Sequence, residues 1–210
     1  MLLGKVRSCL ILPLNHYKSK GMNLQIRKAM PADSSEIATI LLLAMEEIVY
    51  EFLGVRDKQA AFHFMEQMVS TENNQYSWQN AHVIHAEDKI AGAVIVYDGA
   101  RLHELRKPVA EYIRAHTSLP FAPEDETQAG EFYLDSIGVH PEWQGKGIGG
   151  TLLQYLISEY VEKQGLKLGL LVEKANPAAR RLYEKVGFRK TGEKTLVGKT
   201  MDHLQVFIAK

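Results

Sequence analysis

The amino-acid sequence predicts a single domain of the α+β class, with helices packed against a central sheet. Short apolar runs typical of strands alternate with segments whose apolar residues have helical spacing, and two pairs of these runs are joined by tight turns, as in β-hairpins. The chain has 210 residues, which is enough for one domain with a substantial core and short for two. The sequence contains no internal repeat and no low-complexity segment.

The domain is predicted to begin with a strand and two helices. Residues 23–28 have the pattern of a strand. Asp33 is followed three positions later by Glu36, which is typical of a capping box at a helix start, and apolar residues at helical spacing continue to Ile48. Residues 58–70 predict a second helix with one buried face.

A hairpin and a broken helix are predicted next. Residues 81–86 and 90–97 are rich in residues that favour strands, and a short charged turn separates them. Residues 101–116 predict a helix. We expect Pro108 to interrupt this helix, because proline lacks the N–H group that a helix interior requires.

A strand that leads into a glycine-rich helix start is predicted in the second half. Residues 131–139 form a short apolar run that suits a buried strand, and Pro141 ends it. Apolar residues resume at helical spacing from Ile148, so four glycines and Lys146 lie at the first turn of this helix. Residues 166–172 predict the next strand.

The last elements are predicted to be a helix and a hairpin. Asn176 as N-cap and Pro177 at the first helical position are a common helix start, and we expect Gly187 to end the helix. Residues 188–197 and 201–208 predict the final hairpin.

Composition excludes several functional classes. The chain carries 25 basic and 25 acidic residues, so it lacks the basic surface typical of a nucleic-acid-binding protein. No apolar run approaches the roughly 18 residues that a membrane span requires. Cys9 is the only cysteine, which excludes a disulfide framework and fits a reducing compartment. His63, His82 and His85 have no partner at metal-ligand spacing. We therefore expect a cytoplasmic protein with no metal and no nucleic-acid or membrane partner.

The first residues of the chain differ from the rest. Lysine and arginine occur there, whereas the first acidic residue is Asp33. We expect residues 1–21 to be an N-terminal extension and residues 22–210 to be the domain, with Met22 as an alternative natural start.

The glycine-rich junction is the strongest candidate for a binding site. Gly145, Gly147, Gly149 and Gly150 lack Cβ atoms, so the backbone can approach a ligand closely. The first N–H groups of the helix and the positive end of its dipole favour an anion. A P-loop is excluded, because no Gly-Lys pair here has both the upstream glycine and the following Ser or Thr that it needs. Two phosphate-binding interpretations remain.

One interpretation is a dinucleotide site. Gly145, Gly147 and Gly150 satisfy G-x-G-x-x-G, and Glu173 lies 23 residues further on, near the place of a ribose-binding acid. However, residues 140–144 separate the strand from the glycines. Only 60 residues follow Gly150, which is too few for the rest of a doubly wound sheet.

The other interpretation is a pyrophosphate held by residues 144–149, and here the sequence resembles a known family. These residues read Q-x-x-G-x-G after a strand that ends in S-I-G-V, and residues 171–188 read L-V-E-K-A-N-P-A-A-R-R-L-Y-E-K-V-G-F. Both blocks resemble the GNAT acetyltransferase superfamily. The resemblance is specific over residues 131–188, weaker in the rest of the domain, and does not include residues 1–21.

The resemblance implies a mixed, mostly antiparallel, six- to seven-stranded sheet, flanked by helices and splayed between its fourth strand (131–139) and its fifth (166–172). It also implies acetyl-CoA in this opening, with pantetheine along the fourth strand and the pyrophosphate on the glycine-rich loop, and it allows a homodimer. The residues that it implies for binding acetyl-CoA are Ile137, Val139, Gln144, Gly145, Lys146, Gly147, Ile148, Gly149, Gly150 and Asn176.

Acetyl transfer to an amine poses two proton problems. An amine with a pKa of about 10.4 needs about 4.6 kcal/mol to free its lone pair at pH 7, and a general base reduces this cost. Glu131 and Asp135 lie on the fourth strand and are the candidate bases, and the assignment stays open between them. Tyr183 matches the helical tyrosine of the family, which would protonate the leaving thiolate or stabilise it by a hydrogen bond.

The sequence therefore predicts an acetyl-CoA-dependent N-acetyltransferase that acts on a primary amine of a small molecule or peptide, by direct attack on the thioester. A non-catalytic acyl-CoA-binding sensor is the alternative. The acidic run 124–126 is a candidate for attracting a cationic acceptor. The side chains expected either to line the acceptor pocket or to pack in the core are Tyr50, Phe52, Met65 and Met68.

Overall fold

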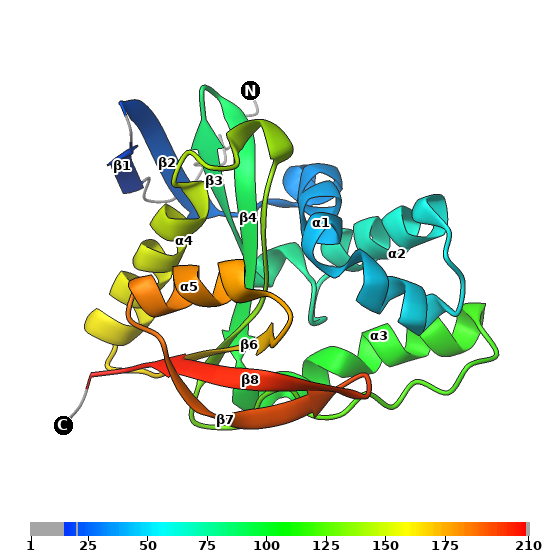
Figure 1. Ribbon diagram of the computed structural model, residues 1–210. Helices are drawn as coiled ribbons and strands as arrows, with labels where there is room; N and C mark the ends of the chain where they lie inside the picture. The colour runs from blue at the N-terminus through cyan, green and yellow to red at the C-terminus, as the bar shows by residue number, and fades with distance from the viewer. Residues whose placement is uncertain (1–14, 20, 209–210) are drawn as a thin grey trace, which may run out of the picture.

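Helices cover both faces of an eight-stranded sheet in the computed structural model, which describes residues 15–19 and 21–208 (Figure 1). The strand order is β1-β2-β3-β4-β5-β6-β8-β7. The strands are β1 (Asn15–Ser19), β2 (Met22–Lys28), β3 (Ala81–Ala86), β4 (Lys89–Asp98), β5 (Phe132–Val139), β6 (Leu168–Glu173), β7 (Arg189–Leu196) and β8 (Lys199–Val206). The helices are α1 (Ser34–Leu53), α2 (Lys58–Ser70), α3 (Leu102–His116), α4 (Ile148–Leu156), which a π-helical segment (Ile157–Glu162) continues, and α5 (Pro177–Lys185). The predicted α+β class and element order are confirmed.

The sheet is mixed, as the family resemblance implies. β5 and β6 are parallel, and every other neighbouring pair among the described strands is antiparallel. Counted from residue 22, these two are the fourth and fifth strands. The sheet is one strand wider than expected, because residues 15–19 pair with β2 as an edge strand. Of the predicted extension, residues 1–14 and 20 lie outside the described residues.

Each face of the sheet has its own hydrophobic core. Figure 1 shows α1, α2 and α3 on one side, where Ile37, Phe64 and Leu105 are buried in the first core. On the other side α4 and α5 cover the second core, which contains Leu152 and Phe188. Because apolar side chains alternate along the strands, the sheet contributes to both cores.

The helix that was expected to break at Pro108 is continuous. A proline inside a helix costs about 3 kcal/mol or more, because one hydrogen bond is lost and the ring crowds the preceding turn. However, Leu102, Leu105, Val109 and Ile113 are all buried along one face of α3. Burial of each such side chain contributes about 1.5–3 kcal/mol. Tertiary packing therefore outweighs the proline, and the prediction of a break is wrong.

The capping box predicted at Asp33 is also wrong. Asp33 precedes α1, but its side chain caps no N–H group of that helix. Its Oδ2 instead accepts a hydrogen bond from the main-chain N–H of Met30 at 2.7 Å, and its two oxygens pair with Arg27 at 2.6 and 2.9 Å. The carboxylate thus joins β2 to the short 3-10 turn that leads into α1.

Gly138 in β5 lets α1 pack directly on the sheet. A Cβ atom at Gly138 would lie 2.3 Å from the main-chain oxygen of Ile40 and 2.7 Å from its Cγ2. A main-chain atom of a buried helix cannot move away by a rotamer change, so we expect Gly138→Ala to lower the free energy of unfolding by about 1–3 kcal/mol in urea titrations. Gly192→Ala in β7, where a Cβ has open space, is the control and should change it by less than about 0.5 kcal/mol. Equal losses in both variants would contradict this packing of α1.

Candidate active site

The sheet opens between β5 and β6. The two strands pair at only three positions, from Phe132 opposite Leu168 to Leu134 opposite Leu170. β5 continues to Val139 along β4, so within the described residues its other edge has no partner strand beyond Leu134. This confirms the splay that the family resemblance implies.

A β-bulge in β5 lies where the opening begins. Leu134 is opposite Val96 and Ser136 is opposite Ile95, so Asp135 is the additional residue on its strand. A bulge bends the strand and changes the direction of a side chain. The residue at this bulge, Asp135, is one of the two predicted bases.

The bulge also determines which main-chain groups face the opening. Phe132 donates its N–H to a carbonyl on the β6 side at 2.8 Å, whereas His140 donates to a carbonyl of β4 at 3.0 Å. Alternation along the strand, shifted by one residue at the bulge, then directs the main-chain groups of Ile137 and Val139 into the opening. The carbonyl of Val139 already accepts a hydrogen bond from Gln144 Nε2 at 3.1 Å, so Val139 offers a ligand its N–H.

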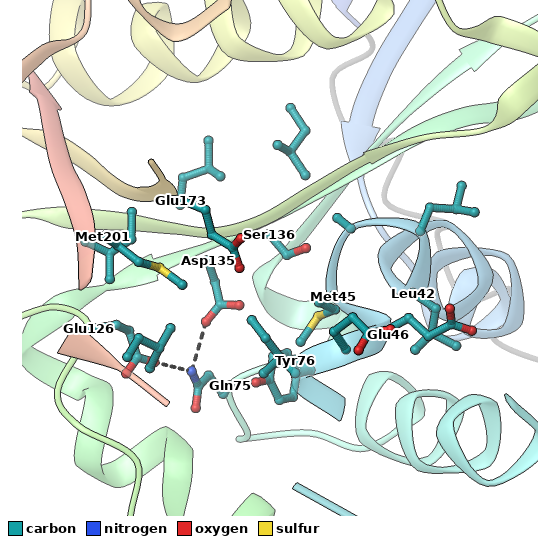
Figure 2. Close-up of a pocket in the computed structure, with 18 of the residues that line it drawn as sticks. Leu42, Met45, Glu46, Gln75, Tyr76, Glu126, Asp135, Ser136, Glu173 and Met201 are labelled. Carbon is teal, nitrogen blue, oxygen red and sulfur yellow. Dashed lines mark hydrogen bonds between the residues drawn. The ribbon is translucent and has the colours of Figure 1, made fainter. Parts of the chain in front are cut away.

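A cleft of about 820 Å³ lies at this opening (Figure 2). Side chains of α1 and of the loop before β5 line one side, and β6, α5 and β8 line the other. Four of the predicted site residues line it: Asp135, Ile137, Asn176 and Tyr183.

The glycine-rich loop lies at the end of β5. Gly145 and Gly147 have φ values of 72° and 92°, which glycine adopts without strain. Gly147 is the N-cap of α4, so the first three N–H groups of that helix have no partner within it. The helix start lies close to the end of β5, since a Cβ added at Gly149 would be 3.7 Å from the side chain of Val139.

A diphosphate fits this loop chemically. The first N–H groups of α4 and the positive end of its dipole favour an anion. Lys146 lies beside them, with its Nζ 4.5 Å from the ring centre of the buried Trp143 in a cation–π contact. The loop therefore has the donors and the charge that the pyrophosphate of acetyl-CoA needs.

Asp135 lines the cleft, and its carboxylate is held by neighbouring side chains. Its Oδ2 accepts hydrogen bonds from Gln75 Nε2 and from the Tyr97 hydroxyl, both at 2.9 Å. Burial and the negative charge of Glu126 raise the pKa of Asp135 to about 7. Its carboxylate is therefore partly protonated at neutral pH, and a general base is most effective when its pKa lies near the working pH.

Asn176 and Tyr183 reach the cleft from α5. Asn176 caps the helix, since its Oδ1 accepts a hydrogen bond from the Ala179 N–H at 3.0 Å, as predicted. It offers a ligand its Nδ2 donors. Tyr183 is 8% exposed, and burial raises its pKa to about 12. Tyr183 therefore stays protonated at neutral pH and can donate a hydrogen bond.

Glu131, the other predicted base, does not line the cleft. It is 3% exposed, and its carboxylate accepts hydrogen bonds from Thr127 and Gln205 and lies 2.9 Å from His203 Nε2. Burial alone would raise the pKa of Glu131, but these partners lower it below its ordinary value. The structure therefore brings Asp135, and not Glu131, together with the other site residues.

The residues that hold Asp135 were not found from the sequence. Gln75 lies in the loop after α2 and Tyr97 at the end of β4, and no local pattern marks either one. The acidic run 124–126 before β5 was noted, but as a candidate for attracting a cationic acceptor. Glu124 accepts a hydrogen bond from the Val197 N–H, and Glu126 pairs with Arg106, so the run is largely occupied by contacts within the protein.

The predicted acceptor-side residues divide into two groups. Phe52 lines the cleft together with Phe62 of α2 and Phe121 of the loop before β5. The rings of Phe52 and Phe121 make an edge contact at 5.0 Å. The others are buried in the first core: Tyr50, Met65 and Met68.

Two features are not found in the described part of the chain. No three His, Cys, Asp or Glu side chains gather there as a candidate metal site. None of the helices in residues 21–208 combines the length and the hydropathy that a membrane crossing needs.

A family model matches the part of the chain that carries this site, and curated sequences match shorter stretches of the chain. A model of the Acetyltransferase (GNAT) family matches residues 42–188. The [ribosomal protein bS18]-alanine N-acetyltransferase of Escherichia coli K12 is 46% identical over 59 residues, which are 28% of this chain and 39% of that protein. The mycothiol acetyltransferase of Corynebacterium aurimucosum is 37% identical over 70 residues, 33% of this chain and 22% of that protein. The matches therefore span less than half of the length of these curated relatives.

Solved structures match nearly the whole fold. An N-acetyltransferase from Staphylococcus aureus Mu50 superimposes with a TM-score of 0.75 at 27% identity, over 86% of this chain and 99% of that one. A second solved acetyltransferase has a TM-score of 0.70 at 26% identity, over 88% of this chain and 99% of its own.

Proposed function

Because the chain belongs to the GNAT acetyltransferase family, we propose that it is an N-acetyltransferase that transfers the acetyl group of acetyl-CoA to a primary amine of a small molecule or peptide. The observation that carries this proposal is the position of Asp135. The bulge in β5 brings this carboxylate to a cleft that Tyr183 also lines, next to the unpaired edge of the same strand. A base, a hydrogen-bond donor and a binding edge for the thioester arm thus share one site.

Acetyl-CoA is bound along β5 in this proposal. The main-chain groups of Ile137, the N–H of Val139 and the Nδ2 of Asn176 bind the pantetheine arm. The pyrophosphate is bound at residues 144–150, where each charge-assisted hydrogen bond contributes about 1.5–3 kcal/mol.

Asp135 takes a proton from the ammonium group of the acceptor. The nitrogen lone pair forms a bond to the thioester carbon, and the carbon–sulfur bond breaks with its electron pair on sulfur. The nitrogen then loses a second proton and the sulfur gains one, which leaves an acetamide and the thiol of CoA, while the proton on Asp135 returns to solvent.

The raised pKa of Asp135 lowers the cost of the first step. Proton transfer from an amine of pKa about 10.4 to a carboxylate of pKa about 7 is uphill by about 4.6 kcal/mol, against almost 9 kcal/mol for an ordinary aspartate. This difference favours Asp135 over Glu131, whose pKa is lowered.

Tyr183 stabilises the leaving sulfur by a hydrogen bond. Full proton transfer from a group of pKa about 12 to a thiolate of pKa about 8.5 is uphill by almost 5 kcal/mol, so the thiol receives the proton that the nitrogen loses. We expect Tyr183→Phe to lower kcat by about 100-fold with little change in the KM for acetyl-CoA, measured by CoA release. An unchanged kcat would show that Tyr183 only packs in the core.

The acceptor binds at the end of the cleft formed by α1, α2 and the loop before β5. Phe52, Phe62 and Phe121 supply aromatic surface there, and Glu46 lines the same end. An amine with an apolar body suits this combination of aromatic surface and acidic groups.

The test is an amine panel incubated with acetyl-CoA, with CoA release and acetylated products measured by mass spectrometry. The panel contains alkyl and aralkyl amines, diamines, amino acids and peptides with free N-termini. Acetylation of any member above the uncatalysed rate supports the proposal. Binding of acetyl-CoA without turnover of any amine would favour the non-catalytic sensor. The cytoplasmic location, the homodimer and the lack of nucleic-acid or membrane partners stay predictions.

A further inference from the structure

A second carboxylate, Glu126, also lines the cleft and has no part in the steps above. It belongs to the loop before β5 and is 4% exposed. Its Oε1 lies 2.5 Å from Gln75 Nε2, which lies 2.9 Å from Asp135 Oδ2 (Figure 2). The Tyr97 hydroxyl also lies between the two carboxylates, at 2.9 Å from Asp135 and 3.3 Å from Glu126. The two carboxylates thus face each other across one amide and one hydroxyl group.

The donors between the carboxylates are few. Gln75 Nε2 has two hydrogens and three oxygen neighbours, and Tyr97 has one hydrogen and two carboxylate neighbours. Both links to Asp135 end at its Oδ2. Its Oδ1 is therefore the oxygen that remains for the acceptor.

Arg106 favours the charged form of Glu126. Its guanidinium group pairs with Glu126 and, at 3.0 Å, with Asp125, and it donates to the main-chain oxygens of Pro123 and Glu124 at 3.0 Å each. Burial raises the pKa of Glu126, and the charge of Arg106 opposes this rise. Because Arg106 pairs with Glu126, and the pKa of Asp135 is raised to about 7, we assign the negative charge to Glu126 and the proton gained near neutral pH to Asp135.

We propose, resting on the proposed function, that Glu126 is a positioning residue that acts through Gln75 and Tyr97. Glu126 keeps Asp135 basic enough to take the proton of the acceptor. Through Gln75 and Tyr97 it also holds Oδ2 of Asp135, so that Oδ1 of Asp135 faces the amine.

The other titratable groups around the cleft are buried tyrosines, which stay neutral, or paired carboxylates that are far more exposed than Glu126, so water screens their charge. Four tyrosines have a pKa that burial raises, and three carboxylates have a basic partner. The tyrosines are Tyr76, Tyr97, Tyr133 and Tyr183, and the pairs are Glu46 with Lys58, Glu47 with Arg56, and Glu173 with Lys199.

The test compares the pH dependence of kcat/KM in two variants that act in opposite directions. In Glu126→Gln the negative neighbour is lost, so the midpoint of the rise with pH should move down by about one to two pH units. In Tyr97→Phe a hydrogen bond to the ionised form is lost, so the midpoint should move up. A general loss of stability would not shift the two midpoints in opposite directions.

A second readout does not depend on turnover. The carboxyl carbon of Asp135 is titrated by ¹³C NMR in the full chain, with Asp135→Asn used to assign its signal. The titration midpoint should shift in the same direction as the kinetic one in each variant. Glu126→Asp keeps the charge and should keep the midpoint near that of the wild type. Glu104→Gln removes one charge from the exposed face of α3 and should change neither readout.

An unchanged midpoint by both readouts in a folded Glu126→Gln protein would overturn the proposal. If Glu126→Gln does not fold, an unchanged midpoint in Tyr97→Phe overturns it. Failure of the proposed function is a separate outcome, in which the NMR midpoints shift as expected but no amine of the panel is acetylated.

Discussion

Asp135→Asn is expected to lower kcat/KM for the acceptor amine by about 10²- to 10⁴-fold, because an amide cannot take the proton of the ammonium group. The asparagine oxygen can still accept the hydrogen bonds of Gln75 and Tyr97, so we expect the fold to persist. The KM for acetyl-CoA should change little, since the proposed contacts of that ligand do not involve this side chain. CoA release measured at pH 5.5–9 checks the prediction.

The direction in which kcat/KM changes with pH follows from the pKa of Asp135. The pKa of Asp135 is raised to about 7, and a base acts only in its deprotonated form. The wild-type kcat/KM should therefore rise with pH through neutrality, and the loss in Asp135→Asn should be largest above that midpoint. If kcat/KM of Asp135→Asn still rose with pH as in the wild type, another group would be the base.

Glu131→Gln is the matched comparison, because it changes the other acid predicted on this strand. Its carboxylate bonds to Thr127 and Gln205 and lies beside His203, so the substitution should lower the Tm. We expect its kcat/KM to stay within about tenfold of the wild type, with the same midpoint. A large loss in Glu131→Gln together with an active Asp135→Asn would reverse the assignment of the base.

The parts of the site that are local in sequence were predictable from the sequence. Gly147 has a positive φ at a helix start, and Asn176 caps α5 from the position before Pro177. Both features follow from short-range rules for glycine conformation and helix capping. For the same reason most helix and strand positions were predicted to within a few residues.

The proposed choice of Asp135 over Glu131 could not be made from the sequence, because it depends on contacts between distant segments. Asp135 bonds to Gln75, 60 residues away, and to Tyr97, 38 residues away. Its direction depends on a bulge, which exists only in the register of β5 against β4. A pattern within one strand carries no information on that register.

Two errors in the predicted fold have a similar cause. Pro108 was expected to break the helix, which is its local effect, but the burial of one face of α3 outweighs that effect. Residues 15–19 have mixed polarity and no clear strand pattern, yet their main chain pairs with the edge of β2. Tyr17 of this strand also makes an edge contact with Tyr155 of α4, with ring centres 6.4 Å apart. In both places tertiary contacts decide the structure.

Gly147→Asp is expected to weaken CoA binding by about 10²- to 10⁴-fold, measured as the Kd by calorimetry. Position 147 is the N-cap of α4 and has a φ of 92°. A carboxylate there lies next to the first N–H groups of the helix, competes for them and repels the pyrophosphate. The loss of two charge-assisted hydrogen bonds corresponds to about 3–6 kcal/mol, at 1.4 kcal/mol per tenfold in Kd. At saturating acetyl-CoA, kcat should recover, because the base and Tyr183 are unchanged.

Gly130→Asp separates this effect from backbone strain. Gly130 precedes β5, has a φ of 98° and has open space around a Cβ. The substitution therefore adds the same charge and a similar strain at the opposite end of the strand, where no pyrophosphate is proposed. We expect its Kd for CoA to stay within about twofold of the wild type. If both variants weaken binding equally, strain and not the helix start explains the loss, and the pyrophosphate must bind elsewhere than at α4.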